Sequence, residues 1–219
     1  MNSKRYDAVI FDWDGTVMDS THAIATAIRM ASTDLGLSVP SMSLASWVIG
    51  LSLESALYRA VPDLDAEQMP LFLERYRHHF FQRDPEIKLF DGVLDFMNEL
   101  KAEQIVLSVA TGKSRVGLDR VLSNVRLTDY FDATRCADET QGKPHPLMLY
   151  EIMDELSLSP ERVLMIGDTT HDIVMASSAG MDSLAVTYGA HDPKTLRSAD
   201  PTYMVDSVST MRETVLRLI

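Results

Sequence analysis

Val9-Ile10-Phe11-Asp12-Trp13-Asp14-Gly15-Thr16 is the stretch around which the whole chain is organised. The apolar run that begins at Ala8 predicts a short buried strand, and this strand ends in two carboxylates one residue apart. Like charges this close raise one pKa unless a cation or a shared proton compensates, so the pair suggests a metal site or a nucleophile with a proton donor. Alternatively, Asp14-Gly15 is only a turn and Asp12 an acid on an edge strand. The stretch alone leaves both readings open.

The composition limits the class of protein. With 219 residues the chain can form one large domain, or a core domain that carries a smaller insertion. Its net charge of −12, without a cluster of Lys and Arg, argues against nucleic acid as a partner. The single cysteine, Cys136, excludes internal disulfides. We find no signal peptide and no apolar stretch of membrane-spanning length, and therefore expect a cytoplasmic protein that does not bind membranes.

The block after Thr16 changes from a strand pattern to a helical one. Apolar residues from Ala23 to Leu35 recur at helical spacing, Ser20 or Thr21 could cap the helix start, and Gly36 stands at its C-terminal end. From Val39 to Asp84 the pattern stays helical. We therefore expect residues 18–85 to form a helical insertion, and residues 1–17 and 86–219 to form an α/β core.

From Phe90 onward, helices and strands alternate, which predicts βαβ units in a doubly wound, Rossmann-like parallel sheet. In such sheets ligands bind at the carboxyl ends of the strands. The expected strands are Ile105–Ala110, Phe131–Cys136, Val163–Ile166 and Ser183–Thr187. The expected helices are Asp91–Ala102, Arg115–Asn124, Pro144–Leu156 and Thr170–Ala179.

Reactive groups follow the strands in a distinctive order. The motifs are Asp12-Trp13-Asp14-Gly15-Thr16, then Ala110-Thr111-Gly112, then Gly142-Lys143-Pro144, and finally Gly167-Asp168 with Asp172 four residues later. Each motif alone is weak and has an ordinary structural explanation as a turn, a cap or a solvated lysine. Together, in this order and spacing, they resemble the haloacid dehalogenase superfamily of phosphotransferases along the whole chain.

The resemblance implies a nucleophile and a metal. Asp12 would attack phosphorus and form an aspartyl-phosphate, which splits one difficult displacement into two easier ones. A Mg²⁺ ion would lie between this carboxylate and the phosphate anion, held by Asp12, Asp168 and the backbone carbonyl of Asp14. Asp172 would bind the ion through water or orient its ligands.

The resemblance also implies roles for the remaining motif residues. Asp14 would protonate the leaving alcohol and later deprotonate the attacking water. Thr111, the backbone N–H of Gly112 and the ammonium of Lys143 would hold the oxygens of the transferring phosphoryl group. Lys113 follows this turn and could also contact the substrate.

The second acid of the first motif, Asp14, and the helical insertion indicate which subgroup of the superfamily the chain resembles. Asp14 is absent from the branch that cleaves carbon–halogen bonds, so its presence favours a phosphate ester. Residues 18–85 resemble the cap shared by phosphoglycolate phosphatases and β-phosphoglucomutases, which closes over the site. Gly50 and Ser52 lie in a segment similar to the cap loop that faces the site, although they could equally be a plain helix N-terminus.

The prediction is therefore a Mg²⁺-dependent phosphatase, monomeric or homodimeric, that acts on a small soluble phosphate monoester, with phosphoglycolate as the first expectation. A phosphomutase of the β-phosphoglucomutase type would carry the same motifs and remains an alternative. A non-catalytic interaction module would not require both Asp12 and Asp14. Trp13 and His171 are expected to be packing or surface residues, and His145 could support Lys143.

Overall fold

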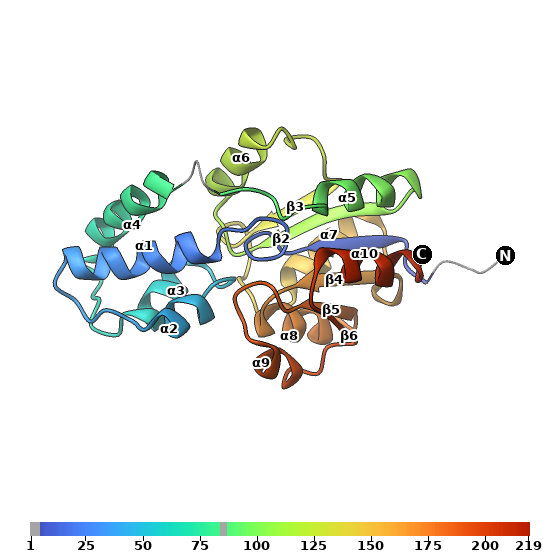
Figure 1. The fold of residues 1–219 in the computed structure, drawn as a ribbon. Coiled ribbons are helices and arrows are strands. Elements are labelled where there is room, and N and C mark those ends of the chain that lie inside the picture. Colours follow the sequence, from blue (N-terminus) through green and yellow to red (C-terminus); the bar gives the residue numbers. More distant parts are fainter. Residues whose placement is uncertain (1–4, 84–86) are drawn as a thin grey trace.

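Six parallel strands form one sheet in the order β3-β2-β1-β4-β5-β6 in the computed structural model, which describes residues 5–83 and 87–219 (Figure 1). Phe11 of β1 pairs with Val109 of β2 on one side and with Ile166 of β4 on the other. This register brings the carboxyl ends of the three central strands to one edge of the sheet. The strands are β1 Ala8–Phe11, β2 Val106–Thr111, β3 Ala133–Cys136, β4 Val163–Gly167, β5 Asp182–Val186 and β6 Tyr203–Val205.

Helices cover both faces of the sheet because the strands are apolar on both sides. Val9 and Phe11 pack with the helices of one face, and Ala8 and Ile10 with those of the other. The first face carries α5 Val93–Ala102, α6 Arg115–Asn124 and α10 Val208–Leu216. The second carries α7 Leu147–Leu156 and α8 Thr170–Ser178, with α9 Pro193–Arg197 packed beside α8 and a 3₁₀ turn at Pro160–Arg162.

A separate group of helices lies beyond the carboxyl ends of the strands (Figure 1). It has an apolar core of its own, in which Ile28, Leu57 and Phe72 are buried. Two connections join it to the sheet, and they are hydrogen-bonded to each other: Asp19 N–H to the Lys88 carbonyl at 2.9 Å, and Phe90 N–H to the Val17 carbonyl at 3.0 Å. The group consists of α1 Thr21–Asp34, α2 Met42–Trp47, α3 Leu53–Ala60 and α4 Met69–Arg83.

The predicted α/β class is confirmed, and the expected strands lie within two residues of those observed. The helix expected from Pro144 begins only at Leu147. His145 precedes Pro146, and a residue before proline is disfavoured in helical conformation. The predicted domain boundary between residues 85 and 86 lies outside the described residues, so the division into domains stays a prediction. No helix within the described ranges is long and apolar enough to cross a membrane.

Candidate active site

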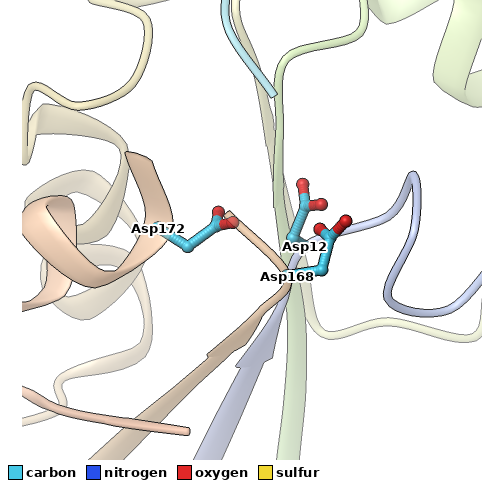
Figure 2. Close-up of side chains that lie close together, drawn as sticks. All are labelled: Asp12, Asp168 and Asp172. Carbon is cyan, nitrogen blue, oxygen red and sulfur yellow. The ribbon is translucent and has the colours of Figure 1, made fainter. Parts of the chain in front are cut away.

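Three buried carboxylates meet at the carboxyl edge of the sheet. Asp12 directly follows β1, Asp168 directly follows β4, and Asp172 lies in the first turn of α8. Figure 2 shows Asp12 and Asp168 side by side, with the carboxylate of Asp172 pointing toward them. Each of the three offers one oxygen within 4.8 Å of the others, and none is more than 1% exposed. This set of hard oxygen atoms is of the kind that binds Mg²⁺.

Asp168 is held from both sides. Thr16 Oγ1 donates a hydrogen bond to Oδ1 at 3.2 Å, and the backbone N–H of Ala190 donates to Oδ2 at 2.6 Å. A Cβ atom on either Gly15 or Gly189 would overlap this carboxylate. The two glycines therefore provide the space that Asp168 occupies.

Lys143 joins Asp172 to Asp12 within the buried cluster. The Lys143 ammonium donates to Asp12 Oδ1 at 2.5 Å and to Asp172 Oδ1 at 2.7 Å. The other oxygen of Asp172 accepts from Thr169 N–H at 3.1 Å and from Thr169 Oγ1 at 2.7 Å, which completes a capping box at the start of α8. Asp172 is thus fixed in place and positions Lys143 against Asp12.

The charges of the cluster do not balance. Three buried carboxylates face one buried ammonium, that of Lys143, so full ionisation leaves two negative charges of the cluster without a cationic partner in the described part of the chain. Burial raises the pKa of Asp12 and that of Asp168 above their usual range. Burial alone would lower the pKa of Lys143, but the charges of Asp12 and Asp172 raise it, and the lysine stays protonated. A divalent cation would restore neutrality.

Asp12 keeps one oxygen free for chemistry or metal binding. Its Oδ1 accepts the hydrogen bond from Lys143, whereas Oδ2 is buried without a hydrogen-bond partner among the residues that the structure describes. An unsatisfied buried oxygen is costly, and such atoms commonly indicate a missing ion or a reactive role.

Asp14 lies beside the cluster in a different environment. Its Oδ1 accepts a hydrogen bond from Ser20 Oγ at 2.5 Å and lies 3.0 Å from the Lys113 ammonium. Ser20 precedes α1 as its N-cap, but its hydroxyl makes no bond to the helix backbone. The predicted helix-capping role of this hydroxyl is therefore replaced by a contact with Asp14.

The turn after β2 lies directly beneath the helical group. Thr111 is buried, and its Oγ1 accepts from Lys113 N–H at 3.2 Å. A Cβ on Gly112 would overlap the carbonyl oxygens of Gly50 and Leu51. Gly50 itself has a φ of +93°, which favours glycine. The loop that carries Gly50 is therefore in contact with the turn that was expected to hold phosphoryl oxygens.

Ser52, His145 and Trp13 lie at a helix cap, in an exposed turn and in the core, respectively. Ser52 is the N-cap of α3, and its Oγ donates to Ser55 Oγ at 2.8 Å. His145 is exposed and accepts from Leu147 N–H at 3.2 Å, so it does not support Lys143. Trp13 is fully buried against the edge of Phe131, in agreement with a packing role.

A tryptophan connects the helical group to the sheet. The carbonyl oxygen of Trp47, at the end of α2, accepts hydrogen bonds from His171 Nε2 at 3.1 Å and from His191 Nε2 at 2.9 Å. The Trp47 ring stacks on His191 and meets the edge of His171, and the guanidinium of Arg59 lies 4.1 Å from its centroid. Burial lowers the pKa of His171 to about 4 and also lowers that of His191, so both rings are neutral near pH 7.

Sequence reasoning missed Ser20, Gly189, Ala190, Trp47 and His191 as contributors to this region. A signal existed for Gly189 and Ala190, which follow the end of β5 as the other site residues follow β1, β2 and β4. The hydroxyl of Ser20 and the ring of Trp47 find their partners only through tertiary folding, and no spacing in the sequence indicates them.

Comparisons with known proteins agree with this geometry. The family model described as haloacid dehalogenase-like hydrolase matches residues 9–186. A probable phosphatase, IndB, from Dickeya dadantii is 34% identical over 92% of this chain and 90% of its own length. A phosphoglycolate phosphatase from Aliivibrio fischeri is 28% identical over 90% of this chain and 91% of its own. The crystal structure of a predicted phosphatase from Clostridium acetobutylicum matches with a TM-score of 0.84 and 27% identity, covering 97% and 99% of the two chains.

Proposed function

The chain belongs to the haloacid dehalogenase-like hydrolases, and from this premise we propose that it hydrolyses a phosphate monoester through an aspartyl-phosphate on Asp12, with Mg²⁺ as cofactor. Phosphatase activity itself follows from the family and from the phosphatases that match nearly the whole chain. The observation that carries the mechanism is the buried Asp12 carboxylate, whose Oδ2 is unpartnered while Oδ1 is held by Lys143.

The three-carboxylate cluster supports Mg²⁺ as the cofactor. Asp12 and Asp168 would supply hard oxygen ligands, and two negative charges of the cluster have no cationic partner within residues 5–83 and 87–219. The backbone carbonyl of Asp14 is a further expected ligand, and Asp172 orients the cluster through Lys143. When bound, the ion would offset the repulsion between a carboxylate nucleophile and a phosphate anion.

In the first step, one carboxylate oxygen of Asp12 would form a bond to phosphorus while the bond to the alcohol oxygen breaks, and the other oxygen would stay available to the metal. Asp14 would give its proton to the departing alcohol oxygen. In the second step, a water oxygen would attack the same phosphorus, Asp14 would take up the proton of the water, and the bond to Asp12 would break. Ser20 and Lys113 hold the Asp14 carboxylate for both proton transfers.

The phosphoryl oxygens would be held by groups around Asp12. Thr111 ends β2, Gly112 follows it, and the Lys143 ammonium contacts Asp12, so the Thr111 hydroxyl, the Gly112 N–H and the Lys143 ammonium are the donors proposed to hold these oxygens. Because charge spreads over these oxygens in the transition state, donors fixed by burial are more effective than mobile ones.

The helical group would act as a cap. We propose that residues 18–85 close over the site as a domain of their own, because the loop at Gly50 already contacts Gly112. Closure would exclude water during the first step and bring Gly50 toward the substrate, and contact of Ser52 with the substrate stays a prediction. A cytoplasmic location and a monomeric or homodimeric state stay predictions from the sequence.

The test is phosphate release from a panel of esters, including phosphoglycolate, sugar phosphates and nucleotides, with Mg²⁺ and with chelator. We expect release that requires Mg²⁺ and that Asp12→Asn reduces by at least about a thousandfold, since a carboxamide cannot replace the nucleophile. Asp182→Asn, at the amino-terminal end of β5 and away from the carboxyl edge of the sheet, is the control and should keep wild-type turnover.

Two results would contradict the proposal. Turnover that persists in the folded Asp12→Asn variant would remove Asp12 as the nucleophile. Absence of release from every ester, with transfer of a phosphoryl group to an acceptor sugar instead, would replace hydrolysis by the phosphomutase alternative.

A further inference from the structure

A cavity of 610 Å³ opens beside the candidate site, between the helical group and the core. It shares Asp14, Gly50, Gly112 and Lys113 with the site described above. Asp14 is the residue proposed to protonate the leaving alcohol, so the cavity begins where the alcohol part of a substrate would lie.

Apolar side chains form most of the cavity wall. Eleven of the twenty lining residues are aliphatic or aromatic, and they come from both sides of the cleft. Tyr76, Phe80 and Phe81 of α4 supply the aromatic part, and the rings of Tyr76 and Phe80 are stacked with centroids 6.0 Å apart. Ile28 of α1 and Val116 of α6 add aliphatic surface.

Four of the five charged residues of the lining lie against protein groups, and the fifth is Arg77. The Lys113 ammonium lies 3.0 Å from Asp14 and 5.5 Å from the Phe80 ring centroid. The guanidinium of Arg120 lies 4.8 Å from the Phe81 centroid, and Asp138 accepts from the backbone N–H of Arg115 at 2.8 Å. These four groups lie against aromatic rings or face other residues, whereas Arg77 adds a cation to a lining that is otherwise mainly apolar.

The size and the lining argue against a two-carbon alcohol part. Cavities of about 300–1,000 Å³ with apolar walls typically bind ligands of drug size. The glycolate part of phosphoglycolate would fill a small fraction of 610 Å³ and would leave most of the apolar wall in contact with water. A large apolar group would instead displace water from this surface, which is favourable.

We propose that the substrate is a phosphate monoester whose alcohol part carries a large apolar group, with an aromatic ring on a short alkyl arm as the best match, bound between α4 and α6. This inference rests on the proposed function, because it assigns the leaving alcohol to the cavity next to Asp14. It replaces phosphoglycolate, expected from the sequence, by a larger and less polar ester.

The test compares phosphate esters of primary alcohols. Because these alcohols are similarly basic leaving groups, differences in kcat/KM among the esters reflect how the alcohol part binds and not how easily its bond to phosphorus breaks. The series is phosphoglycolate, ethyl, butyl, hexyl and 2-phenylethyl phosphate, each assayed for kcat and KM with Mg²⁺. We expect kcat/KM to rise roughly twofold to fourfold per added methylene, and at least tenfold from ethyl to 2-phenylethyl phosphate.

Two half-exposed residues of α4 provide a matched pair of variants. Phe81 lines the cavity and is 50% exposed, whereas Leu71 lies outside it and is 46% exposed, so neither truncation removes a core residue. Phe81→Ala should lower kcat/KM for 2-phenylethyl phosphate roughly threefold to tenfold more than for ethyl phosphate, mainly through KM. Leu71→Ala should keep the wild-type ratio between the two esters.

The outcomes separate this inference from the proposed function. If phosphate is released but phosphoglycolate or ethyl phosphate is preferred, the apolar-substrate inference is overturned and the phosphatase remains. If Phe81→Ala and Leu71→Ala change the ester ratio equally, the cavity does not bind the alcohol part. If no ester is hydrolysed by the folded protein with Mg²⁺, the proposed function itself fails.

Discussion

The position of the Asp168 carboxylate depends on neighbouring residues that have no reactive side chain. Its carboxylate lies between Gly15 and Gly189, where any Cβ would overlap it, and Ala190 N–H donates to it. The orientation of this expected Mg²⁺ ligand therefore depends on a glycine after β5 that has no reactive group. Groups that orient metal ligands typically change metal affinity or activity 10- to 100-fold when mutated.

Gly189→Ala should accordingly raise the Mg²⁺ concentration for half-maximal rate by about 10- to 100-fold, because the added methyl group displaces Asp168. Gly36→Ala is the matched control. Gly36 has a φ of +67° with open space around it, so alanine there should cost about 1–2 kcal/mol of stability but leave the Mg²⁺ dependence unchanged. The measurement is the initial rate across a Mg²⁺ titration, together with urea unfolding of both variants. Equal Mg²⁺ dependence in Gly189→Ala and wild type would contradict this role.

At the residue scale, the sequence predicted the groups that follow strands and missed those that only tertiary contact defines. Asp12, Asp168 and Lys143 stand in motifs that can be recognised from the sequence alone. The fold brings these residues into contact with one another or with a shared neighbour. Ser20 or Thr21 was expected to cap α1, as serine and threonine commonly do before a helix. The Ser20 hydroxyl bonds to Asp14 instead, and local sequence does not distinguish the two partners.

At the scale of elements, Trp47 joins α2 to the core. Trp47 offers its carbonyl to both His171 and His191 and packs its ring against theirs. The Gly50 loop follows α2 directly, so this attachment determines how closely the loop approaches Gly112. Aromatic pairs of this kind contribute about 0.5–1.5 kcal/mol each beyond their buried area.

Trp47→Ala should therefore favour an open arrangement of the helical group. It keeps the backbone carbonyl but loses the ring contacts, and a loss of about 1–2 kcal/mol corresponds to a roughly fivefold to thirtyfold shift from closed to open molecules. We expect faster hydrogen exchange at residues 48–52 and a lower kcat/KM. Tyr58→Ala, an exposed aromatic of α3, should change neither. Unchanged exchange in Trp47→Ala would show that the ring does not hold the helices in place.

The elements with strong apolar periodicity were predictable, and the weak ones were not. The helix expected at Arg115–Asn124 is observed with those bounds, and the strand expected from Val163 extends one residue further than predicted. β6 contains only Tyr203–Val205, too short for alternation to be recognised, and α10 follows it without having been expected. The sheet order comes from parallel pairing across long crossovers, which local sequence patterns do not specify.

At the scale of the whole molecule, a chain of negative net charge places two lysines at the carboxyl edge of the sheet. The net charge is −12, yet Lys143 and Lys113 both lie against the carboxylates at the ends of the central strands. The parallel sheet gathers the reactive groups, and the helical group covers them and forms the cavity wall. We expect both parts to be needed for the proposed reaction, in which Asp12 would be phosphorylated and Asp14 would transfer the protons.

The central claim is tested most directly by trapping the phosphoryl group on Asp12. Asp14→Asn should slow attack by water, while an aryl phosphate such as 4-nitrophenyl phosphate, whose leaving group needs little protonation, still reacts in the first step. The variant is mixed with this ester and Mg²⁺, quenched in acid, digested with pepsin at low pH and mapped by mass spectrometry. We predict a phosphoryl group on the peptide that contains Asp12, and none when Asp12→Asn is added to the same variant. Release of nitrophenolate with the phosphoryl group on another residue, or on none, would contradict the account.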